Sequence, residues 1–198
     1  MDFKNLANQY KDELLNNVLP FWLQNSQDKE FGGYFTCMDR EGKVFDTDKF
    51  VWLQGREVWM FSMLYNKMEK RQEWLDCAVQ GGEFLKKYGH NGEYNWYFSL
   101  DRLGRPLVEP YNIFSYTFAT MAFGQLSLAT GNQEYADIAR KTFDIILSKV
   151  DNPKGKWNKL HPDTRNLKNF ALPMILCNLA MEIEHILGTD YLEQAIDA

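Results

Sequence analysis

Cysteine and histidine are scarce in this sequence, with three of each among 198 residues. The cysteines, Cys37, Cys77 and Cys177, are odd in number and widely spaced, which fits neither a disulfide framework nor a zinc site. The histidines show no metal-binding spacing, such as a pair one helical turn apart. We therefore expect no metal and no cofactor.

Long apolar runs and clusters of positive charge are also missing. The longest nearly apolar run, 170–181, is shorter than the ~20 residues that span a bilayer, and residues 1–15 mix charges among the apolar positions, unlike a signal peptide. The net charge is −5 and the basic residues are scattered, which disfavours nucleic acid or an anionic membrane as a partner. These absences predict a cytoplasmic protein with neither partner.

Aromatic residues, in contrast, are abundant at 15% of the chain. Rings in this quantity suit a large core or a carbohydrate-binding cleft, where they cover the apolar faces of sugars. We expect most of them to lie in the core.

Helical periodicity of the apolar residues marks six segments: 3–25, 49–69, 72–88, 111–130, 133–149 and 167–187. The second, fourth and sixth are apolar on several faces, whereas the third and fifth carry charges along one side. This alternation predicts an inner and an outer ring of helices.

The connections between the helices repeat as well. Asp39-Arg40-Glu41-Gly42 recurs as Asp101-Arg102-Leu103-Gly104, and each copy lies between β-prone residues. Both are expected to be hairpin turns in which glycine takes a positive φ. Helices following the apolar ones open at Trp74, Tyr135 and Tyr191, so the repeating unit is a stacked helical hairpin.

Two or three such hairpins curve without closing a ring, and a further helix has just begun when the chain stops at Ala198. The sequence therefore predicts that residues 1–198 are the N-terminal portion of a single toroid domain, cut inside its seventh helix. A short native protein with a frayed last helix is the alternative.

Four segments together resemble the N-acylglucosamine 2-epimerase family: Gly32-Gly33-Tyr34-Phe35, Trp52 to Trp59, Asn112 to Ala119, and Arg165 to Met174. The similarity runs in order over nearly the whole chain. It implies an all-α fold, the (α/α)6 toroid or barrel, of roughly twice this length, of which this chain holds about the first six helices. It also implies interconversion of N-acetylglucosamine and N-acetylmannosamine, a small-molecule sugar being the partner.

That reaction opens the sugar ring to an aldehyde, removes the C2 proton to give an enolate, and returns a proton from the opposite face. Negative charge develops on O1 and needs a fixed donor. Arg56 lies among large aromatic residues, and we expect it to be buried and to fill this role, as the resemblance implies. A salt bridge to Glu57 or a neighbouring helix is the structural alternative. Glu57 is expected to be a structural partner, not a base.

The proton-transfer groups of the family are histidines and a glutamate that the resemblance places beyond the matched region. His90, His161 and His185 are expected to be surface or capping groups. We therefore expect the isolated chain to be inactive.

Weaker sugar-binding candidates lie on the inner helices. Trp52 is one helical turn before Arg56, so the two share a helix face. Their spacing predicts that the ring and the cation together form a binding platform for a sugar. Phe114 and Tyr116 lie at the start of the second inner helix. They are expected either to stack on or hydrogen-bond to the sugar or to pack in the core. By analogy with cellobiose-acting relatives, Asn169 is expected to contact a hydroxyl, with a plain helix-cap residue as the alternative.

Two other functions remain open on the sequence alone. Toroids of this kind also serve glycoside hydrolases, whose paired carboxylates would come from Asp46, Asp48, Glu109 or Glu182. A non-catalytic binding module is the other alternative, because half a toroid exposes apolar faces. A homodimer is also open on the sequence alone, because self-association would cover these faces.

Overall fold

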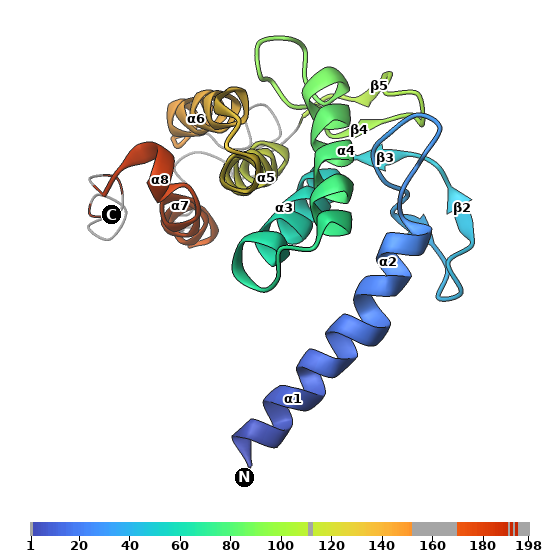
Figure 1. Cartoon of the computed structure of the whole chain (residues 1–198). Coiled ribbons are helices and arrows are strands. Elements are labelled where there is room, and N and C mark those ends of the chain that lie inside the picture. Colours follow the sequence, from blue (N-terminus) through green and yellow to red (C-terminus); the bar gives the residue numbers. More distant parts are fainter. Residues whose placement is uncertain (1, 111–112, 152–169, 190, 192, 194–198) are drawn as a thin grey trace, which may run out of the picture.

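The computed structural model describes residues 2–110, 113–151, 170–189, 191 and 193, and it is dominated by helices (Figure 1). In the described part of the chain the helices and strands, in order, are α1 (Phe3–Glu13), a π-helical turn (Leu14–Val18), α2 (Leu19–Asn25), β1 (Cys37–Met38), β2 (Val44–Asp46), β3 (Lys49–Phe50), α3 (Val51–Lys67), α4 (Gln72–Tyr88), β4 (Ser99–Leu100), β5 (Pro106–Val108), α5 (Phe114–Thr130), α6 (Gln133–Ser148), α7 (Ala171–Glu182) and α8 (Glu184–Leu187).

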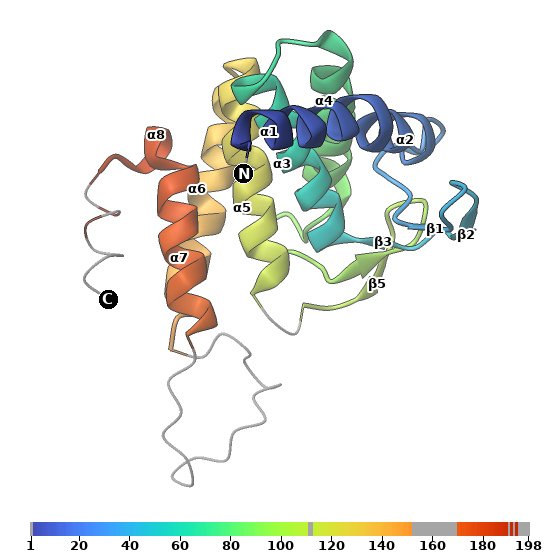
Figure 2. The same cartoon turned by 90° about the horizontal axis from the view of Figure 1, so that it is seen from below.

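The predicted alternation of inner and outer helices is confirmed. Helix α3 packs against α5, and α5 packs against α7, while α4 covers α3 and α6 covers α5. The three inner helices lie side by side with their N-terminal ends on the same side of the molecule (Figure 2). Because each hairpin adds one inner and one outer helix, the described chain forms an open arc of helical hairpins, and its fold is the (α/α)6 toroid that the family resemblance implies.

The first predicted helix, 3–25, is present but contains the π-helical turn Leu14–Val18. Helix α1 extends away from the body (Figure 1) and has no buried residue. Asp2 caps its first turn by accepting hydrogen bonds from the backbone N–H groups of Lys4 and Asn5. Beyond the π-helical turn, α2 contributes Leu19 to the core.

Both predicted hairpin turns are confirmed, and they share the same hydrogen bonds. Oδ1 of Asp39 accepts from the backbone N–H groups of Glu41 and Lys43, and Gly42 has a φ of +87°. In the second hairpin Asp101 and Gly104 repeat this geometry, again with a φ of +87°. The aspartate replaces missing backbone partners, and glycine is required where φ is positive.

The second predicted helix, roughly 49–69, is confirmed, but it starts slightly later, because Lys49 and Phe50 form strand β3. They pair antiparallel with Leu100 and Ser99 of β4, so the second hairpin joins a three-stranded sheet, β3-β4-β5. This pairing joins residues far apart in the sequence, Lys49 to Leu100 and Phe50 to Ser99, which local periodicity cannot indicate. Helix α3 then starts at Val51.

Beside this sheet lies a buried ionic cluster of Asp28, Lys49 and Arg102. Lys49 Nζ donates to Asp28 Oδ2 at 3.0 Å, and Arg102 donates to both oxygens of the same carboxylate at 2.9 and 3.1 Å. Lys49 also donates to the backbone carbonyls of Gly32 and Arg102. Burial raises the pKa of Asp28, but the hydrogen bonds from Arg102 and Lys49 outweigh it and hold this pKa at about 2.

Gly81 and Gly82 in α4 are points of close packing. A Cβ atom on Gly81 would collide with the ring of Tyr34, and one on Gly82 would collide with Leu126 of α5. Tyr34 is fully buried and donates its hydroxyl proton to the carbonyl of Cys77 at 2.7 Å. The chain between α2 and β1 is thus fixed against the inner face of α4.

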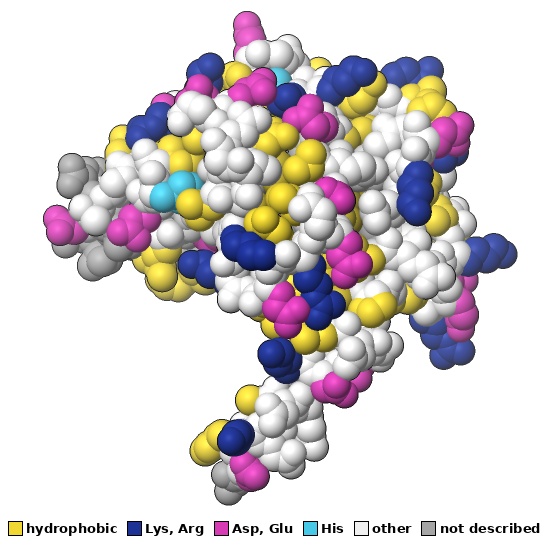
Figure 3. Space-filling view, viewed as in Figure 1, with side chains coloured by type: hydrophobic (Ala, Val, Ile, Leu, Met, Phe, Trp, Pro, Cys, Tyr) yellow, Lys and Arg dark blue, Asp and Glu magenta, His cyan; other side chains and the backbone are white. Residues whose placement is uncertain are grey.

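On the face shown in Figure 3, lysine and arginine side chains are interspersed with acidic ones and form no single basic patch. Among the helices that the structure describes, none combines the length and the apolar character needed to cross a lipid bilayer.

Candidate active site

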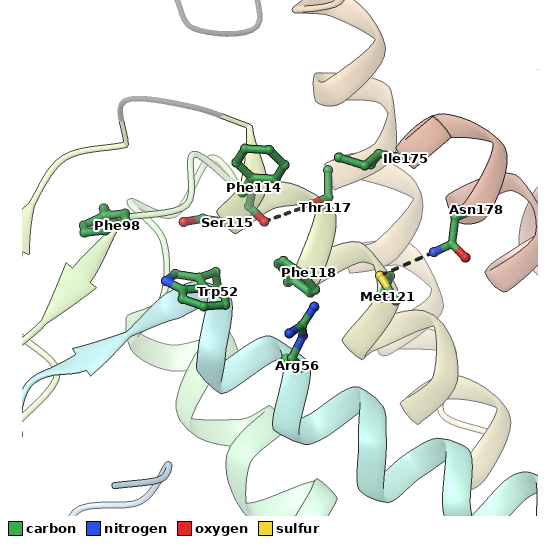
Figure 4. A pocket seen from close by; sticks show the side chains of 10 residues that line it. All are labelled: Trp52, Arg56, Phe98, Phe114, Ser115, Thr117, Phe118, Met121, Ile175 and Asn178. Atoms are coloured by element: carbon green, nitrogen blue, oxygen red, sulfur yellow. Dashed lines mark hydrogen bonds between the residues drawn. The ribbon is translucent and has the colours of Figure 1, made fainter. Parts of the chain in front are cut away.

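The three inner helices line an open cavity of about 560 Å³ near their N-terminal ends (Figure 4). Its walls are mainly aromatic and aliphatic, with few polar groups. The lining residues are Trp52, Arg56, Phe98, Phe114, Ser115, Thr117, Phe118, Met121, Ile175 and Asn178. A largely apolar cavity of this size, with a few polar groups and one cation, has the character of a small-molecule site.

Arg56 lies at this cavity, but the expectation that its side chain is buried is wrong. It is exposed, whereas its neighbours Gly55 and Glu57 are buried. The physical reason is the position of Arg56 on the inner face of α3, which the described helices leave open. Among the ion pairs between described residues none involves Arg56, so the salt bridge to Glu57 is not present there.

The guanidinium of Arg56 stacks over aromatic rings. Its Cζ lies 4.7 Å from the ring centroid of Phe118 and 5.9 Å from that of Trp52, and these two rings are 5.9 Å apart. The structure therefore contains the platform of ring and cation expected from Trp52 and Arg56, with Phe118 as the nearer ring. Such stacking orients the planar cation while its N–H donors stay available to a ligand.

Gly55 explains how the platform forms. A Cβ atom at this position would lie 2.9 Å from the backbone carbonyl carbon and oxygen of Phe118, so only glycine allows α3 and α5 to approach this closely. The close approach brings the ring of Phe118 on α5 against the guanidinium of Arg56 on α3. The glycine directly before Arg56 is thus part of the construction of the site.

The remaining predicted sugar-binding residues separate into three cases. Phe114 lines the cavity and is 40% exposed. Tyr116 does not line it: two positions further along α5 it faces another direction, is 3% exposed, and has its hydroxyl 3.4 Å from Asn95 Oδ1. Burial raises its pKa to about 12. Asn169 lies outside the described residues.

The sequence interpretation missed several lining residues, chiefly Phe118 and Asn178. Phe118 follows Phe114 by four positions and therefore shares its helix face, a signal that could have been used. Asn178 is a polar residue within the apolar helix α7, and its Nδ2 lies 3.8 Å from Met121 Sδ. Met121 and Ile175 could not be separated from ordinary core residues by their type or spacing.

Glu57, which follows Arg56, is 7% exposed, and its Oε1 has no hydrogen-bond partner among the described residues. Burial raises its pKa to about 8, and a hydrogen bond with Ser26 opposes this only in part. The carboxyl group is therefore protonated at neutral pH, and among the described residues it forms no ion pair with Arg56. That Glu57 has a structural role and is not a base stays a prediction.

The histidines that the structure describes do not line the cavity. His90 bonds to the backbone of Lys86 in the last turn of α4, stacks on Tyr94 with centroids 4.8 Å apart, and has a pKa lowered by burial. His185 lies 3.1 Å from Ser127 Oγ. His161 lies outside the described residues.

The carboxylates considered for hydrolysis do not line the cavity either. Glu182 Oε2 accepts hydrogen bonds from Trp59 Nε1 at 3.0 Å and Gln125 Nε2 at 2.9 Å, so it joins three inner helices. Asp46 is exposed on β2. Among the described residues, no three side chains of metal-binding type come close enough together to hold an ion.

Comparison with solved structures defines the class of this fold. The structure of cellobiose 2-epimerase from Bacillus thermoamylovorans B4167 superimposes with a TM-score of 0.80 at 22% identity, covering 98% of this chain and 54% of the other. Such epimerases are (α/α)6 toroids.

Sequence comparison gives the family. The model of the N-acylglucosamine 2-epimerase family matches residues 33–197, and the chain belongs to this family. It is 41% identical over 174 residues to N-acylglucosamine 2-epimerase of Bos taurus, and the aligned region covers 85% of this chain and 41% of the relative. It is 28% identical over 167 residues to cellobiose 2-epimerase of Dictyoglomus turgidum. The chain thus spans about two fifths of the length of the curated relatives it matches.

Proposed function

We propose that this chain carries the sugar-binding and charge-stabilising part of a 2-epimerase that interconverts N-acetylglucosamine and N-acetylmannosamine. The observation that carries the proposal is the exposed guanidinium of Arg56, stacked on Phe118 at the edge of an apolar cavity of about 560 Å³. The 41% identity to an N-acylglucosamine 2-epimerase supports the choice of reaction.

Arg56 binds O1 of the opened sugar and stabilises the enolate. Its charge is permanent, so the attraction to O1 strengthens as negative charge moves from C2 to that oxygen. Trp52 and Phe114 cover apolar faces of the sugar, and Asn169 contacts a hydroxyl. Tyr116, by contrast, acts in this proposal only from the core, since it does not line the cavity.

Proton transfer at C2 requires two groups on opposite faces of the enolate. Neither His90 nor His185 can serve, since their side chains are engaged away from the cavity. We propose that residues 1–198 are the N-terminal portion of one toroid domain and that the proton-transfer groups come from its other portion. The chain by itself then binds sugar but turns over little or none. A cytoplasmic location and a homodimer remain predictions.

Sugar binding by the chain tests the role of Arg56. Arg56→Ala should remove most of the binding of N-acetylmannosamine, measured by ligand-observed NMR, because it removes the one cation at the cavity among its described lining residues. Arg71→Ala is the matched control, since Arg71 also stacks on a tryptophan, with its Cζ 4.8 Å from the ring of Trp74, and lies away from the cavity. Equal binding by both variants would contradict the proposal.

Deuterium exchange tests the division of the mechanism. In heavy water the chain alone should leave the C2 proton of N-acetylmannosamine in place. Uptake of deuterium at C2 that disappears in Arg56→Ala would show that the chain contains its own proton-transfer groups. Release of a reducing sugar from a glycoside would instead favour the hydrolase alternative.

A further inference from the structure

A second cavity, of about 290 Å³, lies next to the first along the surface of α3. It is formed by α2, the segment before β1, and α3, and it is lined by Trp22, Thr36, Leu53, Arg56, Glu57 and Met60. Arg56 lines both cavities. A ligand bound to its guanidinium in the first cavity therefore lies next to the second.

The wall that carries Thr36 is held firmly against α3. The side-chain amide of Gln54 accepts a hydrogen bond from the backbone N–H of Tyr34 and donates one to its carbonyl, both at 2.8 Å. The buried Tyr34 side chain anchors the same segment to α4. Thr36, two residues later, thus faces α3 from a fixed backbone, which is a requirement for selective binding.

Two polar atoms in this wall lack partners. Thr36 Oγ1 and Glu57 Oε1 are both buried and have no hydrogen bond among the described residues. Leaving such atoms without hydrogen bonds costs free energy. Two of them at one cavity therefore indicate that a bound ligand supplies the missing partners. Burial keeps Glu57 protonated at neutral pH, because its pKa is about 8. The carboxyl group therefore donates one hydrogen bond, while the threonine hydroxyl can donate or accept.

The lining of the second cavity indicates which chemical group it can bind. The walls from Trp22, Leu53 and Met60 are apolar, and the two unpaired oxygens offer one donor and one acceptor. A secondary amide with a short alkyl group presents the complementary set: a carbonyl that accepts, an N–H that donates, and a methyl group for the apolar wall. The volume of about 290 Å³ is just below the ~300–1,000 Å³ of ligand pockets and is ample for an acyl substituent.

We propose that this second cavity binds the N-acyl group of the sugar, with Glu57 donating to the acyl carbonyl and Thr36 accepting from the amide N–H. The proposal rests on the proposed function, because it assumes that Arg56 holds O1 of the sugar. The acyl nitrogen is bonded to C2, which is next to C1. Since Arg56 borders both cavities, an N-acyl group on a sugar held in the first cavity can reach into the second. Glu57 and Thr36 would then select N-acyl sugars over sugars with a free hydroxyl at C2.

Three tryptophans make the test direct. The indole of Trp52 lines the first cavity and that of Trp22 lines the second, while Trp74 is 1% exposed within the core and serves as reference. In ¹H–¹⁵N spectra of the labelled chain, N-acetylmannosamine should shift the indole signals of both Trp22 and Trp52. Mannose, which lacks the acyl group, should shift Trp52 alone and bind about tenfold more weakly, as expected for the loss of one or two buried hydrogen bonds.

Variants then identify the selecting residues. Glu57→Leu and Thr36→Val should each lower the affinity for N-acetylmannosamine several-fold and leave that for mannose unchanged. Thr36→Val keeps the shape of the side chain, Glu57→Leu replaces the carboxyl group by a smaller apolar group, and each removes an unpaired buried oxygen, so the fold should tolerate them. Glu73→Leu on the exposed face of α4 is the control for the loss of a carboxyl group.

Each outcome decides between the proposals. A shift of Trp52 without Trp22 on adding N-acetylmannosamine, or equal affinity for the two sugars, overturns the acyl site and leaves the sugar site at Arg56. Retained selectivity in both variants also overturns it. If neither sugar shifts either indole, both the acyl site and the proposed function fail.

Discussion

Asp28 and Glu57 are both buried carboxylic acids, 1% and 7% exposed, yet they are in opposite charge states at neutral pH. Asp28 receives hydrogen bonds from Lys49, from Arg102 and from the backbone N–H groups of Glu30 and Phe31. Glu57 bonds with Ser26 and has a second oxygen without a partner. The pKa is about 2 for the first and about 8 for the second.

The difference shows what each region of the molecule is built to do. Around Asp28 every donor comes from the chain, so the carboxylate is charged and joins the segment before β1 to the second hairpin. Around Glu57 the neighbouring cation, Arg56, stacks on Phe118 instead of pairing with it. A buried group that the chain leaves unpaired costs stability, and such costs concentrate where ligands bind.

Breaking the ionic cluster should have the largest effect on stability. Lys49→Met leaves Asp28 buried with one of its two cations, and the loss of one partner from a buried pair costs about 3–5 kcal/mol. The free energy of unfolding in urea measures this loss. Lys43→Met, on the exposed side of the first hairpin, is the control. A loss below about 1 kcal/mol would mean that Arg102 alone sustains the charge of Asp28.

The pH dependence of stability should reveal the protonated state of Glu57. Its pKa is raised on folding, so its contribution is fully present below pH ~4.5 and is lost as the pH rises to about 8. Between pH 5.5 and 7.5 the folded chain holds one proton more than the unfolded chain, which lowers the free energy of unfolding by ~1.4 kcal/mol per pH unit. Urea unfolding of the wild-type chain and Glu57→Gln at both pH values measures this slope as a difference.

The comparison with Glu57→Gln is needed because His90 and His185 also titrate in this range, with pKa values lowered by burial. Their effect is the same in both proteins and cancels. Tyr34 and Cys77, which interact electrostatically with Glu57, have pKa values raised mainly by burial and stay neutral below pH 8. Identical slopes for the two proteins would show that Glu57 is ionised at neutral pH.

The two regions also differ in how far the sequence predicts them. The hairpin turns were predictable because Asp39 and Gly42 act within four residues, and the helices because their apolar spacing is local. The ionic cluster joins Asp28 to Arg102 across 74 positions, and only the folded chain brings them together. Arg56 was identified from its aromatic neighbours and from the family resemblance, but its exposure and the burial of Glu57 depend on which helices cover α3. Phe118 was within reach of helical periodicity, whereas the second cavity was not.

The repeated turn offers the finest test of the comparison, because Arg40 and Arg102 occupy the same position in the two hairpins. The Arg40 side chain is 92% exposed and pairs with Glu41, whereas that of Arg102 is 35% exposed and binds the buried Asp28 through two nitrogens. Arg102→Ala should lower the free energy of unfolding clearly more than Arg40→Ala, since it removes charge-assisted hydrogen bonds to a buried acceptor. Arg40→Ala should change it by less than about 0.5 kcal/mol, because an exposed ion pair contributes little. Since turn, strand ends and residue type are matched, the difference between the two losses in urea unfolding reports the burial of the partner carboxylate. Equal losses would mean that both arginines act on the turns themselves and that Asp28 depends on Lys49 alone.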